Sequence, residues 1–118
     1  MLTIYHNPRC RKSREAYQYL EAQGISFNTR LYLTDPLTAE QLEALIVKLG
    51  ILPQGLVRTA EAIWKTQYKG QDLSPKATIK AMVDHPKLIE RPLIESDTSA
   101  CIGRPLANVE SFLANLKQ

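Results

Sequence analysis

The stretch "LTIYHNPRCRKSREAYQYLEAQGISFNTRLYL", residues 2–33, decides the fold. Residues 2–5 alternate apolar and polar side chains and stop before an Asn-Pro turn signal, which predicts a short strand. Apolar residues at helical spacing follow over residues 10–23, and a glycine comes next, where helices commonly end. Residues 25–33 are rich in β-branched and aromatic side chains, which predicts a second strand. Together these segments predict a βαβ unit with parallel strands.

The rest of the chain predicts a helical insertion followed by a smaller second half. A capping box at Thr38 and Gln41 begins one helix, which Gly50 ends. The further expected elements are short helical pieces within 51–68, a helix over 74–85, strands at 92–95 and 100–102, and a last helix after Pro105. This order predicts an α/β fold with a thioredoxin-like mixed sheet, helices on its faces and a helical insertion between its halves.

Size and composition favour a single domain over residues 1–118. The chain is 44% hydrophobic and 23% charged, and its first ten residues are too polar for a signal-peptide core or a membrane span. We therefore expect a cytoplasmic protein with no membrane association. The two cysteines stand far apart without metal-ligand spacing, so we expect no metal site. No long basic stripe with interleaved aromatic residues indicates a nucleic-acid partner.

Cys10 is the candidate nucleophile. If a strand ends near Tyr5 and a helix begins near Cys10, the thiol lies at a helix N-terminus, where free N–H groups and the helix dipole favour a thiolate. Four cationic residues stand near it in the sequence and act in the same direction: Arg9, Arg11, Lys12 and Arg14. A reactive cysteine directly after the first strand of a βαβ unit is also typical of thioredoxin-like proteins.

The residues around Cys10 indicate a one-thiol site. Ser13 stands where thioredoxin-like proteins normally carry a second cysteine, so the resolving thiol must come from glutathione, another protein or Cys101. We expect Ser13 to hydrogen-bond the sulfur, to cap the helix, or both. His6, beside Asn7, is expected either to bias the thiolate as a charge neighbour or to close the turn.

Several segments, in the same order along nearly the whole chain, carry a family resemblance. They are "IYHNPRCRKSRE", "LYLTDPLTAEQLEALIVKLGI", "LVRTAE", "HPKLIERPLI" and "IGRP". The chain resembles the glutaredoxin-linked arsenate reductase (ArsC) family, whose active-site segment has an Asn-Pro-x-Cys-x-x-Ser pattern. The fold that this resemblance implies is thioredoxin-like with a helical insertion.

The resemblance also implies a mechanism. Cys10 would attack the central atom of an arsenate-like oxyanion held by Arg58, Arg91 and Arg104, whose forked guanidinium groups suit such anions. Glutathione would then attack the adduct, and glutaredoxin would complete the reduction, with no metal, flavin or nicotinamide bound to the chain. Pro92 would open the strand facing the cysteine through a cis peptide bond. We expect a monomer.

Two features fall outside that pattern. Arg11 and Lys12 stand where the family's arsenate reductases carry Gly and Thr after the cysteine, which places long charged side chains at the mouth of the site. Cys101 is expected to be a small buried hydrophobe, with a resolving thiol as the alternative.

Two other functions are consistent with the residues. One is an Spx-like regulator that binds RNA polymerase, although Ser13 removes the disulfide switch that such regulators use. The other is a glutathione-dependent oxidoreductase that acts on disulfides without arsenate activity.

Overall fold

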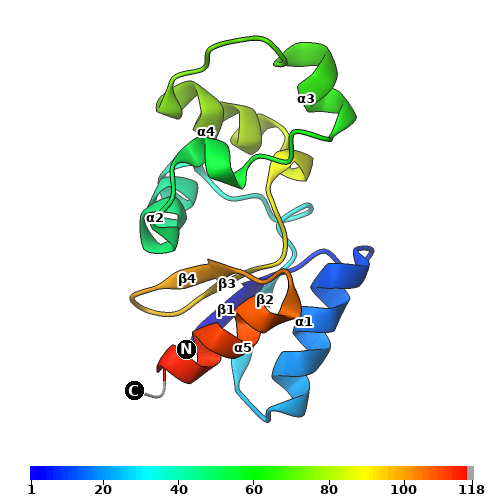
Figure 1. The fold of residues 1–118 in the computed structure, drawn as a ribbon, viewed down its shortest axis with the longest axis vertical. Coiled ribbons are helices and arrows are strands. Elements are labelled where there is room, and N and C mark those ends of the chain that lie inside the picture. The colour runs from blue at the N-terminus through cyan, green and yellow to red at the C-terminus, as the bar shows by residue number, and fades with distance from the viewer. Residues whose placement is uncertain (117–118) are drawn as a thin grey trace. The chain divides into compact units, whose positions relative to one another are not determined.

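A four-stranded mixed sheet forms the centre of the first of two units in this computed structural model, which describes residues 1–116 (Figure 1). Residues 1–35 and the described residues from 91 onward make up this unit, and residues 36–90 make up the second. The first unit contains β1 (Leu2–Tyr5), α1 (Arg11–Ala22), β2 (Phe27–Arg30), β3 (Leu93–Glu95), β4 (Ala100–Ile102) and α5 (Leu106–Leu116). The strand order is β2-β1-β3-β4.

The strand register brings several chain segments to one end of this sheet. β1 runs parallel to β2 and antiparallel to β3, and β3 runs antiparallel to β4. Tyr5 therefore lies opposite Leu93, and Leu93 lies opposite Ile102. Beyond this row, the residues after β1, the residues before β3 and the residues after β4 all emerge at the same end of the sheet.

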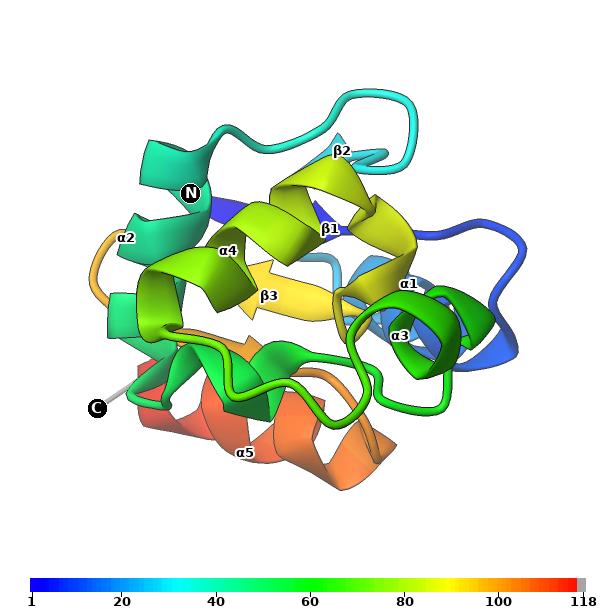
Figure 2. The same cartoon turned by 90° about the horizontal axis from the view of Figure 1, so that it is seen from above.

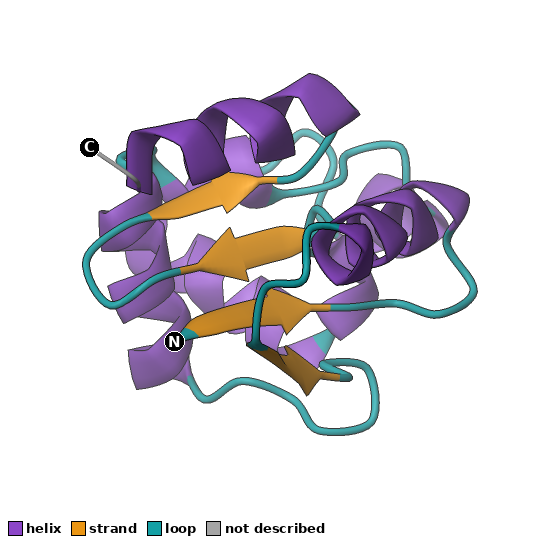
Figure 3. Cartoon of the chain, turned by 90° about the horizontal axis from the view of Figure 1, so that it is seen from below, coloured by secondary structure: helices purple, strands orange, loops and turns teal. Residues whose placement is uncertain are grey.

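Helices α1 and α5 share a hydrophobic core with one face of the sheet, and Figure 3 shows the strands side by side. Alternation in β1 directs Leu2 and Ile4 to this face, while α1 contributes Ala16 and Leu20 from successive turns. The other buried members of the core are Ile94, Val109, Phe112 and Leu113. This packing fixes the start of α1 against the end of β1.

The second unit is helical, and Figure 2 shows its helices from above. It contains α2 (Ala39–Leu49), α3 (Ala62–Gln67), α4 (Pro75–Asp84) and two short 3-10 helices, Pro53–Leu56 and Pro86–Leu88. Helix α2 has the predicted capping box, in which Thr38 Oγ1 accepts from Gln41 N–H and Gln41 Oε1 accepts from Thr38 N–H, both at 3.1 Å. Gly50 ends α2 with a φ of 68°, a left-handed conformation that favours glycine.

The thioredoxin-like fold class predicted from the sequence is confirmed, with two local differences. The short helical pieces predicted within 51–68 are present as a 3-10 helix and α3. The second strand covers only residues 27–30 of the predicted 25–33, because the chain turns at Leu31, whose carbonyl accepts from Thr34 and Asp35 N–H. Leu116, placed on the apolar face of the last helix, is 39% exposed. The single domain over the chain stays a prediction.

Two other kinds of feature are absent from the described part of the chain. None of its helices combines the length and apolar character that a membrane span requires. Residues 1–116 also hold no group of three or more His, Cys, Asp or Glu side chains placed to bind a metal ion.

Candidate functional site

Cys10 occupies the N-cap of α1, at the sheet end where the three strands share one row. Its backbone is extended, with φ −98° and ψ 122°, and its C=O accepts the first helical hydrogen bond from Arg14 N–H at 2.9 Å. The residue is partly exposed. The thiol therefore combines access to solvent with the unpaired N–H groups of a helix start.

Asn7 organises the loop between β1 and α1 through both its backbone and its side chain. Its carbonyl accepts Cys10 N–H at 3.0 Å, and its side-chain Oδ1 accepts Arg9 N–H at 3.0 Å. Arg14 reaches back from α1 and donates from Nη1 to the carbonyl of Pro8 at 3.0 Å. These contacts fix the backbone on which the thiol is carried.

Ser13 contributes to the same loop with its hydroxyl group. The side chain is fully buried, with Oγ 2.6 Å from His6 Nδ1 and 3.0 Å from Asn7 N–H, which donates to it. The N-cap of α1 is Cys10, not Ser13. Ser13 therefore does not cap the helix as one sequence interpretation expected, and its backbone N–H is the group that acts on the sulfur.

His6 is buried and lies between the loop and α1. Its ring stacks on Tyr17 with centroids 4.8 Å apart, and its backbone N–H donates to Arg30 O at 2.9 Å. Burial, with the charge of Arg14 as a second cause, lowers the pKa of His6. A neutral imidazole is favoured, so the structure supports the turn-closing interpretation of His6 over that of a charged neighbour of the thiolate.

The Cys10 thiol has a lowered pKa even though its burial acts in the opposite direction. Burial raises the pKa, and it is outweighed by the N–H of Ser13, the charge and hydrogen-bonding capacity of Arg91, and the N–H of Lys12. The helix start and one guanidinium group therefore favour the thiolate. The charge that acts on the thiol is that of Arg91, 81 positions away in the sequence, and of the four cations near Cys10 only Lys12 contributes, through its backbone N–H.

Arg91 leads into β3 with a partly buried side chain. Its Nε and Nη1 atoms are fully buried, and neither has a hydrogen-bond partner among the described residues. The Arg91–Pro92 peptide bond is cis, the geometry implied for Pro92 by the family resemblance. A buried donor without a partner is costly, about 1–3 kcal/mol for a neutral group and more for a charged one.

Gly103 and Arg104 complete this end of the first unit. Gly103 N–H donates to Pro92 O at 2.8 Å, and a Cβ on Gly103 would lie only 2.9 Å from Pro92 Cγ. The Arg104–Pro105 peptide bond is also cis, and the Arg104 carbonyl accepts from Asn108 Nδ2 at 3.0 Å. Arg104 therefore leaves the sheet beside Pro92, at the same end as Arg91.

Arg58 belongs to the second unit. Its backbone N–H donates to Leu88 O at 2.7 Å, next to a single β-bridge between Val57 and Ile89. Its guanidinium lies 3.4 Å from Glu61 and 3.8 Å from Glu90, measured between the nearest nitrogen and carboxylate oxygen atoms. Both carboxylates partly neutralise a side chain for which the family resemblance implies a role in oxyanion binding.

Cys101 lies in β4 and packs against the core that α1 and α5 form with the sheet. Burial raises the pKa of its thiol to about 12. A thiol with this pKa is almost entirely protonated at neutral pH, and only the thiolate is a competent nucleophile. The environment of Cys101 supports the interpretation as a small buried hydrophobe.

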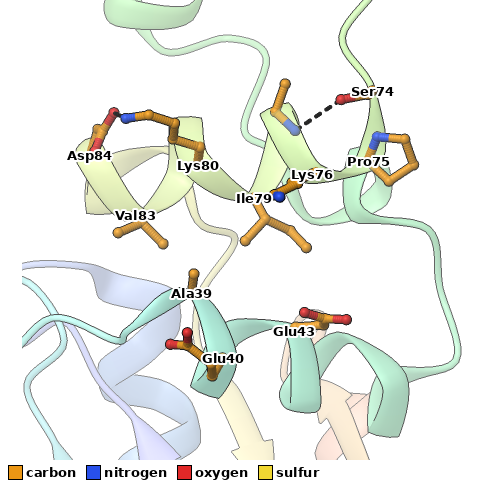
Figure 4. Close-up of a pocket in the computed structure, with 11 residues that line it drawn as sticks. Ala39, Glu40, Glu43, Ser74, Pro75, Lys76, Ile79, Lys80, Val83 and Asp84 are labelled. Atoms are coloured by element: carbon orange, nitrogen blue, oxygen red, sulfur yellow. Dashed lines mark hydrogen bonds and ion pairs between the residues drawn. The ribbon is translucent and has the colours of Figure 1, made fainter.

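A groove in the second unit lies between α2 and α4 and has a different character. Figure 4 shows Ile79 and Val83 of α4 pointing toward α2, with Glu40, Glu43, Lys76 and Lys80 around them. Its lining contains no cysteine, histidine or arginine. The groove offers no nucleophile comparable with Cys10.

The sequence interpretation missed two residues that shape the site. A Cβ on Gly103 would crowd Pro92 and Val109, and the place of this glycine between β4 and the Arg-Pro pair was the available signal. Arg14 was grouped with the cations around the thiol, whereas its guanidinium donates a hydrogen bond to the Pro8 carbonyl. The direction of the Arg14 side chain decides between a charge near the thiol and a contact within the loop, and the sequence does not give this direction.

Comparison with known proteins agrees with this arrangement. A sequence model of the ArsC family matches residues 5–112. An arsenate reductase from Neisseria meningitidis is 37% identical over 114 residues, which cover 95% of this chain and 97% of the relative. The structure of an arsenate reductase from Vibrio cholerae superposes with a TM-score of 0.87 at 39% identity, covering 92% of this chain and 95% of that one. A more distant relative is the global transcriptional regulator Spx 2 of Lactococcus lactis, 27% identical over 96% of this chain and 86% of the relative. With a family match over most of its length and relatives of this identity, the chain belongs to the ArsC family.

Proposed function

We propose that this chain is a thiol-dependent oxyanion reductase of the arsenate reductase type. Its family membership supports thiol-dependent oxidoreduction, and arsenate is the substrate in the names of its relatives from Neisseria meningitidis and Vibrio cholerae. The observation that carries the proposal is the pair of buried, unpartnered nitrogens of Arg91, beside a thiol whose pKa is lowered by the same guanidinium. An oxyanion would satisfy these donors while it is presented to the nucleophile.

In the proposed reaction, the Cys10 thiolate bonds to arsenic(V), and one oxygen leaves as water after protonation. Glutathione attacks arsenic in the adduct and displaces a second oxygen as water. A glutaredoxin thiol then attacks the glutathione sulfur and removes it as a mixed disulfide, and the electron pair of the broken arsenic–sulfur bond stays on arsenic. The two thiols together supply two electrons, so arsenic(V) becomes arsenic(III) while it is still bound to Cys10. Water then cleaves the remaining arsenic–sulfur bond, which releases arsenite and returns Cys10 to the thiolate form. Arg91, Arg104 and Arg58 would neutralise the approach of an anionic nucleophile to an anionic substrate.

An external reductant fits the chemistry of the chain. Ser13 supplies no second thiol, and Cys101 is protonated and packed against the core. A local disulfide at the active-site turn is therefore not available to resolve the adduct. We propose glutathione and glutaredoxin as the reductant pair, acting on a cytoplasmic monomer that needs no bound cofactor.

The test is an arsenate reduction assay with glutathione, glutaredoxin and recycling by NADPH. We expect turnover in the wild type and in Cys101→Ser, and its loss in Cys10→Ser. Arg91→Lys retains a charge beside the thiol but loses the forked donors, so it should keep the thiolate and weaken oxyanion binding. No turnover in the wild type, or equal turnover in Cys10→Ser, would overturn the proposal.

A further inference from the structure

We propose that Asn108 is the positioning residue of Arg104, because its side-chain amide holds the backbone from which this guanidinium reaches the oxyanion. The inference rests on the proposed function, in which Arg104 binds the substrate. Asn108 lies in the first turn of α5, four positions after Arg104, and outside the segments that carry the family resemblance.

Asn108 binds both ends of the link between β4 and α5, which consists of residues 103–105. Its Nδ2 atom donates to the carbonyl of Ile102 at 3.1 Å and to that of Arg104 at 3.0 Å. A primary amide nitrogen carries two hydrogens, so each carbonyl can receive one of them. One side chain therefore fixes the backbone on either side of Gly103.

A backbone contact holds the same link from the side of the sheet. Gly103 is buried, and its N–H donates to Pro92 O at 2.8 Å. Arg91 directly precedes Pro92 in the chain. The backbone around Arg104 is therefore hydrogen-bonded both to α5 and to the segment that carries Arg91.

The guanidinium of Arg104 has no such support of its own. Within residues 1–116, the Arg104 side chain makes no hydrogen bond and no ion pair. Arg58 differs, because Glu61 and Glu90 lie beside its guanidinium. The position of the Arg104 guanidinium consequently depends on the backbone that carries it. A fixed backbone also reduces the conformational freedom that the side chain loses when it binds an anion.

An oxyanion site is sensitive to small errors in position. Guanidinium donors bind a tetrahedral anion well only when their N–H groups point at its oxygens. Loss of the Asn108 amide would leave the link free to move, and Arg104 would meet the anion from a wider range of positions. Since Asn108 is exposed, water can bind the two carbonyls in its absence, so the variant should still fold.

The experiment compares Asn108→Ala and Asn108→Leu with the wild type in the arsenate reduction assay. Leucine is close to asparagine in shape but has no donor, and neither substitution changes the charge near Arg104. Both replacements are better helix formers than asparagine, so a loss in these variants does not come from a weaker α5. Asn115→Ala is the matched control, because Asn115 is an exposed asparagine further along the same helix.

We expect the KM for arsenate to rise by about three- to tenfold in both Asn108 variants, with kcat within about twofold of the wild type. The pH profile of Cys10 alkylation should not move, because Arg104 is not among the groups that lower the pKa of that thiol. Asn115→Ala should match the wild type in all three quantities. An unchanged KM in Asn108→Ala, or a shifted pH profile, would overturn the proposal.

A double-mutant cycle tests whether Asn108 acts through Arg104. Arg104→Ala removes the guanidinium, so the further change Asn108→Ala should raise KM no more in this background. If the two effects multiplied instead, Asn108 would act on another group, and the proposal would be wrong.

Amide hydrogen exchange, followed by NMR, reports on the link directly. The Gly103 N–H should exchange faster in Asn108→Ala than in the wild type, because the link that carries it has lost two of its hydrogen bonds. Asn115→Ala should keep the wild-type rate. Equal rates in Asn108→Ala and the wild type would show that Asn108 does not hold the link.

A last readout separates this inference from the proposed function, because it needs no turnover. Sulfate is an unreactive tetrahedral oxyanion, and its binding should slow the alkylation of Cys10 by iodoacetamide. Asn108→Ala should raise the half-protecting sulfate concentration by the same factor as KM. This rise without arsenate turnover in the wild type would sink only the proposed reaction, whereas turnover with equal KM values would sink only the positioning role. A wild type that neither reduces arsenate nor is protected by sulfate would overturn both.

Discussion

Ser13 Oγ lies 2.6 Å from His6 Nδ1, and the same oxygen accepts the N–H of Asn7 at 3.0 Å. Both side chains are buried, and the contact with Asn7 is partly buried. The serine of the Cys-x-x-Ser pattern therefore stabilises the loop with its hydroxyl group and the thiolate with its backbone N–H. Substitution of the side chain should separate these two effects.

Ser13→Ala should lower the free energy of unfolding by about 1–3 kcal/mol, because it leaves the buried imidazole nitrogen of His6 and the partly buried N–H of Asn7 without this partner. The pKa of Cys10 should change little, since the backbone N–H of residue 13 remains. Chemical denaturation and the pH dependence of Cys10 alkylation measure the two quantities. Ser111→Ala, at an exposed position of α5, is the control. A raised pKa of Cys10 with unchanged stability would show that the hydroxyl acts on the sulfur.

Arg91→Gln should raise the pKa of Cys10, because it removes the charge that opposes the effect of burial. The pH profile of Cys10 alkylation should move to higher pH in this variant and stay close to the wild type in Arg91→Lys. A lowered folded-state pKa contributes stability that is present above the ordinary thiol value of about 8.5 and is lost as pH falls through the folded pKa. Wild type should therefore gain stability over this window relative to Cys10→Ser, and identical pH slopes would contradict a lowered pKa.

Cys101 should be inert in the folded protein. With a pKa raised to about 12, its thiolate fraction at pH 8 is roughly one in ten thousand. Iodoacetamide should modify Cys10 alone under native conditions and both cysteines after unfolding, as peptide mass spectrometry can show. Rapid native labelling of Cys101 would contradict its burial.

The raised pKa of Cys101 predicts that the protein loses stability at alkaline pH. Its contribution to stability is fully present below the unfolded pKa of about 8.5 and is lost as pH rises toward about 12. Wild type should lose up to about 1.4 kcal/mol per pH unit more than Cys101→Ala in this range. Thermal or chemical unfolding at several pH values measures the difference, and Cys10→Ala, which retains Cys101, should keep the wild-type slope.

Gly103→Ala should destabilise the protein by about 1–3 kcal/mol, the usual cost of overpacking. The new Cβ would lie 2.9 Å from Pro92 Cγ and 3.2 Å from Val109 Cγ2, so Pro92 and the adjoining Arg91 must shift. Gly55→Ala is the matched control, because its nearest contact would be an ordinary 3.6 Å. A fully stable Gly103→Ala with unchanged Cys10 reactivity would show that Pro92 tolerates the displacement.

Glu61→Gln should strengthen oxyanion binding, because it removes one of the two carboxylates that neutralise Arg58. We expect the KM for arsenate to fall by about two- to fivefold with little change in kcat. The variant Glu61→Gln/Arg58→Ala should lose this gain. If the double variant also had a lower KM, the effect of Glu61→Gln on arsenate binding would not depend on Arg58.

Elements with clear end signals were well predicted from the sequence. Thr38, Gly50 and Ser74 act locally through capping geometry, and the structure has helix ends at each of them. Helix α3 lacks such a signal, since its N-cap Glu61 makes no side-chain capping bond. The second strand was predicted too long, because residues 31–33 have a composition typical of strands although the chain turns there.

The site was predicted less completely than the fold, for a physical reason. The position of Cys10 at a helix start follows from local sequence, but its lowered pKa depends on Arg91, which β3 brings near through pairing with β1. The neighbouring Arg11 and Lys12 drew attention first and pair with Glu15 instead. Sequence proximity identified the thiol, while the family pattern identified the distant guanidinium.

The pairing of Tyr5 with Leu93 and of Leu93 with Ile102 has a consequence for the stage of synthesis at which Cys10 becomes activated. Ribosomal synthesis proceeds from the N-terminus, so more than 80 residues must be added after Cys10 before Arg91 and β3 exist. Until β3 pairs with β1, the cysteine lacks the charge of Arg91, and the pKa of its thiol should lie closer to the ordinary value. In a growing chain, the Cys10 thiol would therefore be less reactive until β3 has been made. It would reach its full reactivity only when β3 pairs with β1 and brings Arg91 near.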